Sequence, residues 1–161
     1  MLIRRLLTSA GHGVHSPLAY ELITQVLCSA SACYYATPRL ADATARRWLR
    51  VAVRFNPRRV GRVGRAESRL DSVFPLIGAE LADGPWPAFT AAVSPADADL
   101  DRIADTLGPE GTVMLYRAPH RAVERIAAGR THGIMTFSGR DEHYLVARPD
   151  LPRQHFDIIL R

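Results

Sequence analysis

One short junction constrains the fold of this chain more than any other stretch. Residues 59–63 have the character of a short strand, glycines stand at Gly61 and Gly64, and residues 67–82 show the apolar spacing of a helix. A strand that passes through a glycine-containing turn into a helix is typical of α/β proteins, where the turn often holds a nucleotide-like ligand. We therefore expect an α/β fold with a candidate ligand site at this turn.

Beyond the junction the sequence alternates between strand and helix patterns. Helices are predicted from Asp97 to Leu107 and over 119–128, where apolar residues recur at helical spacing. Further strands are predicted over 86–93, 112–116, 132–137, 142–148 and 154–160. This alternation, closed by three consecutive strands, predicts an α/β sandwich with a mostly parallel sheet and an antiparallel meander of C-terminal strands.

The segment before the junction has the pattern of helices. Ser16-Pro17 is a helix start, because serine can cap and proline is tolerated at the first helical position. A second helix is predicted over 39–54. We expect a single domain over 1–161, divided into an N-terminal helical segment (1–55) and a shortened Rossmann-like core (56–161).

Composition indicates a globular chain outside the membrane. Apolar residues make up 47% and charged residues 23%, and no apolar run approaches the roughly 20 residues of a membrane helix. The opening residues 1–7 have arginines inside a short apolar patch, which argues against a secretory signal. Cys28 and Cys33 are interpreted as unpaired thiols. We expect a cytoplasmic protein.

Positive charge is concentrated next to the junction. The formal net charge is +5 and every basic residue is arginine, which indicates a compositional bias rather than a choice for binding nucleic acid. Four arginines at 58, 59, 62 and 65 could still hold phosphate. No aromatic stacking platform accompanies them, so a solvated face is the preferred interpretation and we expect no nucleic-acid partner.

Other candidate chemistry has ordinary explanations. The histidines stand at positions 12, 15, 120, 132, 143 and 155. His12 and His15 lack a third nearby ligand, so we predict no metal site. The acidic residues 97, 99 and 101 stand at a helix N-terminus, where they favour the helix dipole. No catalytic motif is present, and we predict no catalytic residues.

Three stretches together resemble a known family. They are Gly11-His12-Gly13-Val14-His15-Ser16-Pro17 with the helix that follows, Phe55-Asn56-Pro57-Arg58-Arg59-Val60, and the segment from Tyr144 to Phe156. In this order they are similar to a bacterial branch of the class I S-adenosylmethionine-dependent methyltransferases, which opens with a G-x-H-S-P signature. The resemblance implies a Rossmann-like core that binds S-adenosylmethionine at the turn after its first strand.

The turn departs from the family pattern in its charge. Gly64 matches the first family glycine, but Arg62 stands where the family has an acidic residue and Ser68 where it has a later glycine. S-adenosylmethionine carries a sulfonium and an ammonium group, so a guanidinium at this position would repel it. At a few ångströms in a partly dry site that repulsion amounts to several kcal/mol.

Other ligand-handling positions also differ. With 67–82 assigned to a helix, no acidic residue ends a second strand, and two strand–helix units appear deleted. Ser94 stands where relatives place an aspartate, and Tyr116-Arg117 where they have paired aspartates. Each departure removes a group that the resemblance would assign to the cofactor.

The leading interpretation is a degenerate, non-catalytic methyltransferase-like protein, a pseudoenzyme without cofactor. It would have a structural or partner-binding role, with another protein or a second copy as partner. Gly61, Gly64 and Ser68 would then be vestigial cofactor-binding positions. One alternative is an active S-adenosylmethionine-dependent methyltransferase on an unknown small acceptor, with the ligand at Gly61, Gly64 and the helix over 67–82. A third is a phosphate- or nucleic-acid-binding module. The sequence leaves open whether the chain is an enzyme.

Overall fold

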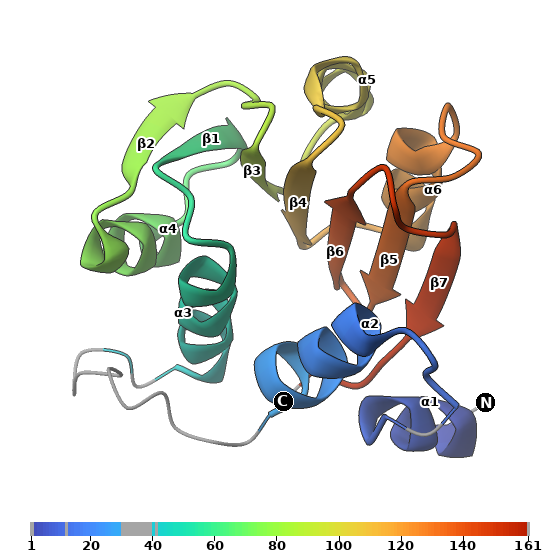
Figure 1. The fold of residues 1–161 in the computed structure, drawn as a ribbon. Coiled ribbons are helices and arrows are strands. Elements are labelled where there is room, and N and C mark those ends of the chain that lie inside the picture. The colour runs from blue at the N-terminus through green and yellow to red at the C-terminus, as the bar shows by residue number, and fades with distance from the viewer. Residues whose placement is uncertain (1, 12, 30–39, 41, 161) are drawn as a thin grey trace.

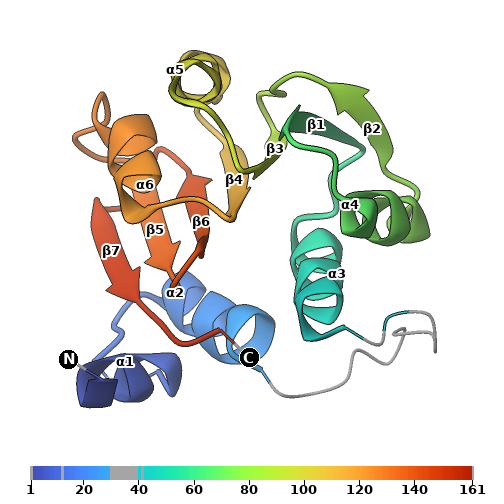
Figure 2. The same ribbon diagram turned by 180° about the vertical axis from the view of Figure 1, so that it is seen from behind.

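The computed structural model describes residues 2–11, 13–29, 40 and 42–160, which form one sheet with helices on both faces (Figures 1 and 2). The strands are β1 (Arg59–Gly64), β2 (Glu80–Asp83), β3 (Phe89–Val93), β4 (Gly111–Tyr116), β5 (Ile134–Ser138), β6 (Glu142–Ala147) and β7 (Gln154–Asp157). The helices are α1 (Leu2–Ser9), α2 (Pro17–Glu21), α3 (Ala43–Phe55), α4 (Ser68–Val73), α5 (Asp97–Thr106) and α6 (His120–Ala127), with a π-helix η1 (Leu22–Leu27) and a 3-10 helix η2 (Phe74–Ile77).

The sheet has the order β2-β1-β3-β4-β6-β5-β7. β6 pairs antiparallel with β4 and β5, and the other strand pairs are parallel. The predicted fold class, a mostly parallel sheet with antiparallel pairing near the C-terminus, is confirmed. The meander prediction is wrong for the last strand, which pairs parallel with β5. The turn after β6 packs across the start of β5, where Gly133 N donates to Leu151 O at 2.8 Å, and so leads β7 to the outer edge.

Two apolar layers cover the sheet, one on each face. Side chains of η1, α3 and α4 pack on one face, and those of α5 and α6 on the other. Alternation along β4 shows the division, because Met114 belongs to the first layer while Val113 and Leu115 belong to the second. Figure 2 shows α6 in front of β5, on the side away from α2.

The N-terminal helices begin where capping chemistry permits. Ser16 Oγ accepts from Ala19 N at 3.3 Å, which confirms the predicted helix start at Ser16-Pro17. Asp42 caps α3 by accepting from Thr44 N at 2.8 Å, and the helix ends at Asn56 in the left-handed conformation with φ 43°. In the described part of the chain no helix combines the length and apolar character needed to cross a membrane.

The predicted helix over 67–82 is wrong in its second half. α4 and η2 end at Gly78, whose φ of 76° stops the helix, and residues 80–83 form β2 beside β1. The sequence did not reveal β2 because it is a four-residue edge strand with no fully buried side chain. A second strand is therefore present, although no helix follows it before β3.

A short crossover explains Gly61. Residues 84–88 carry the chain from β2 across β1 to β3 without a helix, and Thr90 Oγ1 fixes this segment by bonding to the N and O atoms of Trp86 at 2.8 and 2.9 Å. A Cβ atom at Gly61 would lie 2.4 Å from Gly84 O and 2.5 Å from Trp86 N. Gly61 is thus required by the close approach of two backbone segments.

Candidate functional site

The chain changes direction across the sheet between β1 and β3, and ligands of open α/β sheets usually bind at the carboxyl ends of such strands. Gly64 ends β1 with φ 83°, and a Cβ atom there would lie 2.2 Å from Val93 O. Arg65 N donates to the same carbonyl at 2.8 Å. The turn after β1 is therefore held tightly against the end of β3.

A small cavity lies between this turn and α4. Its volume is about 210 Å³, below the roughly 300–1,000 Å³ typical of ligand pockets. It is lined by Arg62, Val63, Gly64, Arg65, Ala66, Glu67, Leu70, Asp71 and Asp83. Of the predicted cofactor positions, Gly64 lines the cavity, Gly61 lies beneath the crossover, and Ser68 begins α4, where its carbonyl accepts from Ser72 Oγ at 2.8 Å.

Arg62 makes two ion pairs at this cavity. Its Nη1 lies 3.1 Å from Asp71 Oδ1 and its Nη2 lies 2.8 Å from Asp83 Oδ1. Asp83 is the last residue of β2, so the expectation that no acidic residue ends the second strand is wrong. The expectation is wrong because the helix predicted over 67–82 covers residues 80–82, which belong to β2. The charge inversion at Arg62 is accompanied by two carboxylates that neutralise it.

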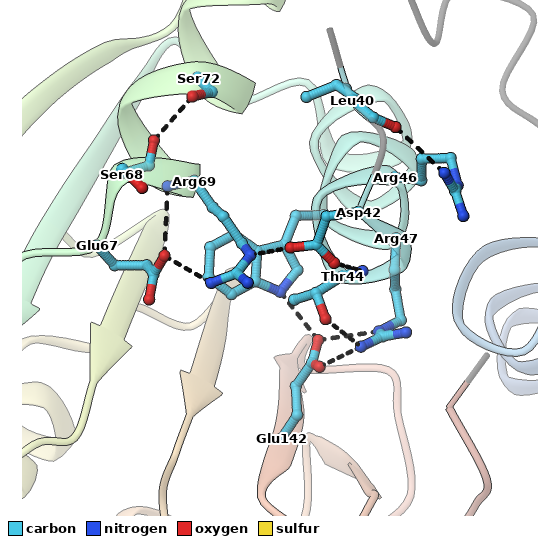
Figure 3. A network of polar contacts seen from close by, with 11 residues as sticks. Leu40, Asp42, Thr44, Arg46, Arg47, Glu67, Ser68, Arg69, Ser72 and Glu142 are labelled. Carbon is cyan, nitrogen blue, oxygen red and sulfur yellow. Dashed lines mark hydrogen bonds and ion pairs between the residues drawn. The ribbon is translucent and has the colours of Figure 1, made fainter. Parts of the chain in front are cut away.

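The third carboxylate of the cavity, Glu67, is also paired with an arginine. Glu67 Oε1 caps α4 by accepting from Arg69 N at 3.4 Å and forms an ion pair with Arg69 Nη1 at 2.7 Å. Arg69 Nε donates to Asp42 at the start of α3 (Figure 3). Burial alone would raise the pKa of Asp42, but its hydrogen bonds with Arg69 and Thr44 outweigh burial and lower it.

A buried polar cluster lies at the end of β4, where Glu142 is paired in register with Tyr116. Glu142 Oε1 accepts from Trp48 Nε1 at 2.9 Å and from Arg47 Nε at 3.0 Å, and Oε2 lies 2.5 Å from Arg47 Nη2. Tyr144 OH donates to the same carboxylate. Glu142 and Arg47 are only 2% and 6% exposed. We call Arg47, Trp48, Glu142 and Tyr144 the Glu142 cluster; Figure 3 shows Arg47 and its bonds to Glu142.

The electrostatics of the Glu142 cluster follow from burial and pairing. Burial alone would lower the pKa of Arg47, but the neighbouring Glu142 and Tyr144 raise it. Burial, then the negative charge of Glu142, raises the pKa of Tyr144 well above its ordinary value. Arg47 is thus kept charged and Tyr144 neutral, which suits a structural role better than proton transfer.

The other departures from the family pattern have structural roles here. Ser94 adopts φ 45° and its N donates to Tyr116 O at 2.9 Å, joining two loops at the carboxyl edge. Tyr116 packs edge-on against Trp48 with ring centroids 5.2 Å apart. Arg69 lies over the Tyr116 ring at 5.8 Å. Side chains of α3 and α4 thus cover the carboxyl end of β4.

The basic cluster does not form one surface. Arg59 and Arg62 are three residues apart on β1 and therefore face opposite sides of the sheet. Arg59 pairs with Glu80 at 3.0 Å and stacks on Trp86 at 4.6 Å. Arg65 follows the opposite end of the strand from Arg59. This dispersal argues against the phosphate- or nucleic-acid-binding interpretation.

A larger cavity of about 520 Å³ lies at the amino ends of the parallel strands. Its lining includes Phe55, Trp86, Phe89 and Val146, with Arg58 and Glu110 at its polar positions. Ligands of open α/β sheets bind at the carboxyl ends of the strands, which is the opposite edge. We therefore do not assign this cavity a function.

Three residues that the sequence interpretation treated as unrelated lie together beside α6. His120, His155 and Asp157 each bring one potential ligand atom within 4.8 Å of the others. We call them the histidine cluster. His120 and His155 are 35 residues apart in sequence, which matches no short ligand motif, so spacing alone could not find the cluster. His15 is exposed, while His12 and Cys33 fall outside the described residues.

Comparison with known proteins adds little to this description. No protein-family model matches the chain, and no curated protein matches it. Among solved structures the chain is similar to a predicted O-methyltransferase from Agrobacterium tumefaciens, with 10% identity, a TM-score of 0.38, and coverage of 63% of this chain and 79% of that one. At that TM-score the likeness carries no argument, so the conclusions here rest on strand order and side chains.

Proposed function

We propose that this chain is a methyltransferase-like domain that does not bind S-adenosylmethionine and acts through structure or through contact with a partner. The family is proposed from the motif resemblance at the N-terminus, the first strand and the C-terminal segment. The lack of cofactor binding is proposed from the small cavity and the paired charges at the carboxyl ends of the strands.

One observation carries the proposal. The cavity at Gly64 has a volume of about 210 Å³, and each of its three carboxylates is already paired with an arginine. A cationic methyl donor would need one of these carboxylates as its counter-ion. It would therefore have to separate an existing ion pair and also widen a cavity smaller than a typical ligand site.

Calorimetric titration with S-adenosylmethionine and S-adenosylhomocysteine tests this directly. We expect no heat of binding for either compound at concentrations up to the millimolar range. Micromolar affinity for either would overturn the proposal. The thermal melt of the same sample serves as the control, because a cooperative transition shows that the tested protein is folded.

The active-enzyme alternative has one observation in its favour. Asp83 stands at the carboxyl end of β2 with its side chain 89% exposed, where a carboxylate could reach ribose hydroxyls. If wild type binds S-adenosylmethionine and Asp83→Asn does not, the alternative is supported. Glu80→Gln is the matched control, since Glu80 lies on the same strand but at its other end.

A partner-binding role is consistent with the surface of α1. Ile3 is 74% exposed, and Leu6 and Leu7 are 42% and 49% exposed. Adjacent apolar side chains in water favour contact with another protein or a second copy. Light scattering coupled to size exclusion distinguishes a dimer from a monomer, and Leu7→Ser should reduce any self-association.

A further inference from the structure

The histidine cluster joins two elements on the α6 face of the sheet. His120 is the first residue of α6, while His155 and Asp157 belong to the edge strand β7. The side chains of His120 and His155 are 47% and 39% exposed, so solvent reaches both rings. The two rings meet edge to face with centroids 5.0 Å apart.

The distances between potential ligand atoms fit a tetrahedral metal ion. His120 Nε2 lies 3.3 Å from His155 Nε2, and His155 Nε2 lies 3.5 Å from Asp157 Oδ1. Zinc bonds to nitrogen and oxygen of roughly 2.0–2.2 Å in a tetrahedron imply donor separations of about 3.3–3.6 Å. A tetrahedral ion thus fits these two pairs without large movement.

The hydrogen bonds of His155 leave the correct nitrogen for a metal. His155 Nδ1 is 2.6 Å from Thr136 Oγ1, whose hydroxyl donates to Gln154 O at 3.4 Å. When the hydroxyl donates to Gln154 O, its oxygen accepts from His155 Nδ1–H. The Nε2 atom of His155 then carries a lone pair directed towards the cluster.

A carboxylate also lies near His120, just beyond hydrogen-bond distance. His120 Nδ1 is 3.6 Å from Glu124 Oε1, one helical turn along α6. A proton on Nδ1 is favoured by this carboxylate, which leaves Nε2 as an acceptor. With both rings in this tautomer, the two Nε2 lone pairs lie 3.3 Å apart and can bind the same cation.

The surroundings provide access and further polar atoms. A cavity of about 400 Å³ is lined by both His120 and His155, which gives an ion a route from solvent. In the cross-strand register Ser138 pairs with both His143 and Asp157, so the three residues form one row on this face of the sheet. Ser138 Oγ and His143 Nδ1 have no hydrogen-bond partner among the described residues.

We propose that His120, His155 and Asp157 bind a divalent transition-metal ion of the zinc type, with a fourth position left for water. Two imidazoles and one carboxylate suit such an ion, whereas Mg²⁺ and Ca²⁺ favour oxygen ligands. The ion would clip β7 to α6 and so secure the sheet edge. This proposal is independent of whether the chain binds S-adenosylmethionine.

Titration of the metal-free full chain with Zn²⁺, followed by calorimetry, tests the site. We expect one Zn²⁺ per chain in wild type and no measurable binding in His155→Gln or Asp157→Asn. His132→Gln is the matched control, because His132 is an exposed histidine outside the cluster and its variant should bind like wild type. Unchanged binding in His155→Gln, or no binding in wild type, overturns the proposal.

Two further measurements separate a built site from casual binding to histidine. Glu124→Gln should weaken Zn²⁺ binding by about tenfold, since it removes the negative charge 3.6 Å from His120 Nδ1. Mg²⁺ should not bind at the same concentrations, and Zn²⁺ affinity should fall on acidification because ligation needs unprotonated imidazole. Equal affinity for Mg²⁺, or a Glu124→Gln variant indistinguishable from wild type, would contradict the assignment.

Discussion

The Glu142 cluster and the histidine cluster lie on opposite faces of the same end of the sheet. Glu142 faces α3, while the row through Ser138 and Asp157 faces α6. In the Glu142 cluster the carboxylate accepts hydrogen bonds from an arginine, an indole and a phenol. In the histidine cluster two ring nitrogens lie 3.3 Å apart, and the tautomers of the two rings decide which nitrogen donates.

The difference shows how to separate structural polar groups from candidate sites. A buried carboxylate with a full set of donors is stable where it is and has no capacity for a ligand. A partly exposed group of imidazole and carboxylate side chains keeps its potential ligand atoms within reach of solvent, where a cation can bind them. A search for buried charged groups alone would have selected the Glu142 cluster as the candidate ligand site.

Arg47→Ala should produce the largest effect and tests the first half of this comparison. It leaves Glu142 charged and buried without its main partner, so we expect a loss of about 3–5 kcal/mol in the free energy of unfolding. Urea denaturation measures it. Arg54→Ala is the control: its ion pair with Glu21 is exposed on both sides, and the expected change is below about 1 kcal/mol. Equal effects of the two changes would break the comparison.

Gly64→Ala should have the next largest effect on stability. It tests how tightly the turn after β1 packs against the end of β3. The new Cβ would lie 2.2 Å from Val93 O on a residue with φ 83°, so we expect a loss of about 2–3 kcal/mol. Gly129→Ala adds the same methyl group where nothing lies within 4 Å, and should change stability by less than about 0.5 kcal/mol. A neutral Gly64→Ala would mean that the turn can open.

Much of the fold was predictable because its signals are local. The alternation of strands and helices from β3 onwards follows the period of the apolar residues and the positions of turn residues. Ser16 is a residue type that caps helices, and Gly64 is a residue type that adopts positive φ, so both roles could be predicted from the sequence. β2 was missed because an edge strand half exposed to water shows no period. The direction of β7 depended on the path of a turn, which the apolar pattern does not record.

The sites were less predictable because they depend on contacts between distant residues. Asp83 was overlooked once its strand was assigned to a helix, and the partners of Arg62 lie 9 and 21 residues away from it. His120 and His155 are brought together only when β7 takes the outer edge of the sheet. Gly61 was assigned to a ligand, whereas the crossover that requires it has no sequence signature.

Tyr144→Phe should have a smaller effect, and the part of it that depends on pH appears in alkali. The folded protein raises the pKa of Tyr144 above its unfolded value, so the neutral form is favoured on folding and its stabilisation is present at lower pH. Stability should be lost as the pH rises through about 10, by up to about 1.4 kcal/mol per pH unit. Denaturation curves between neutral pH and pH 11 should slope less steeply in Tyr144→Phe. Identical slopes would show that the phenol ionises freely in the folded protein.

Arg62→Gln should have the smallest effect on stability. It tests whether charge or the small cavity prevents cofactor binding at the carboxyl ends of the strands. Its two ion pairs are largely exposed, so removing them should cost less than about 1 kcal/mol. The change frees Asp71 and Asp83 and removes the inverted charge, yet we still expect no S-adenosylmethionine binding by calorimetry. Gly64 remains packed on Val93 O, and the cavity of about 210 Å³ is small for any cofactor. Binding gained by Arg62→Gln would mean that charge alone excludes the cofactor and that the closed edge does not.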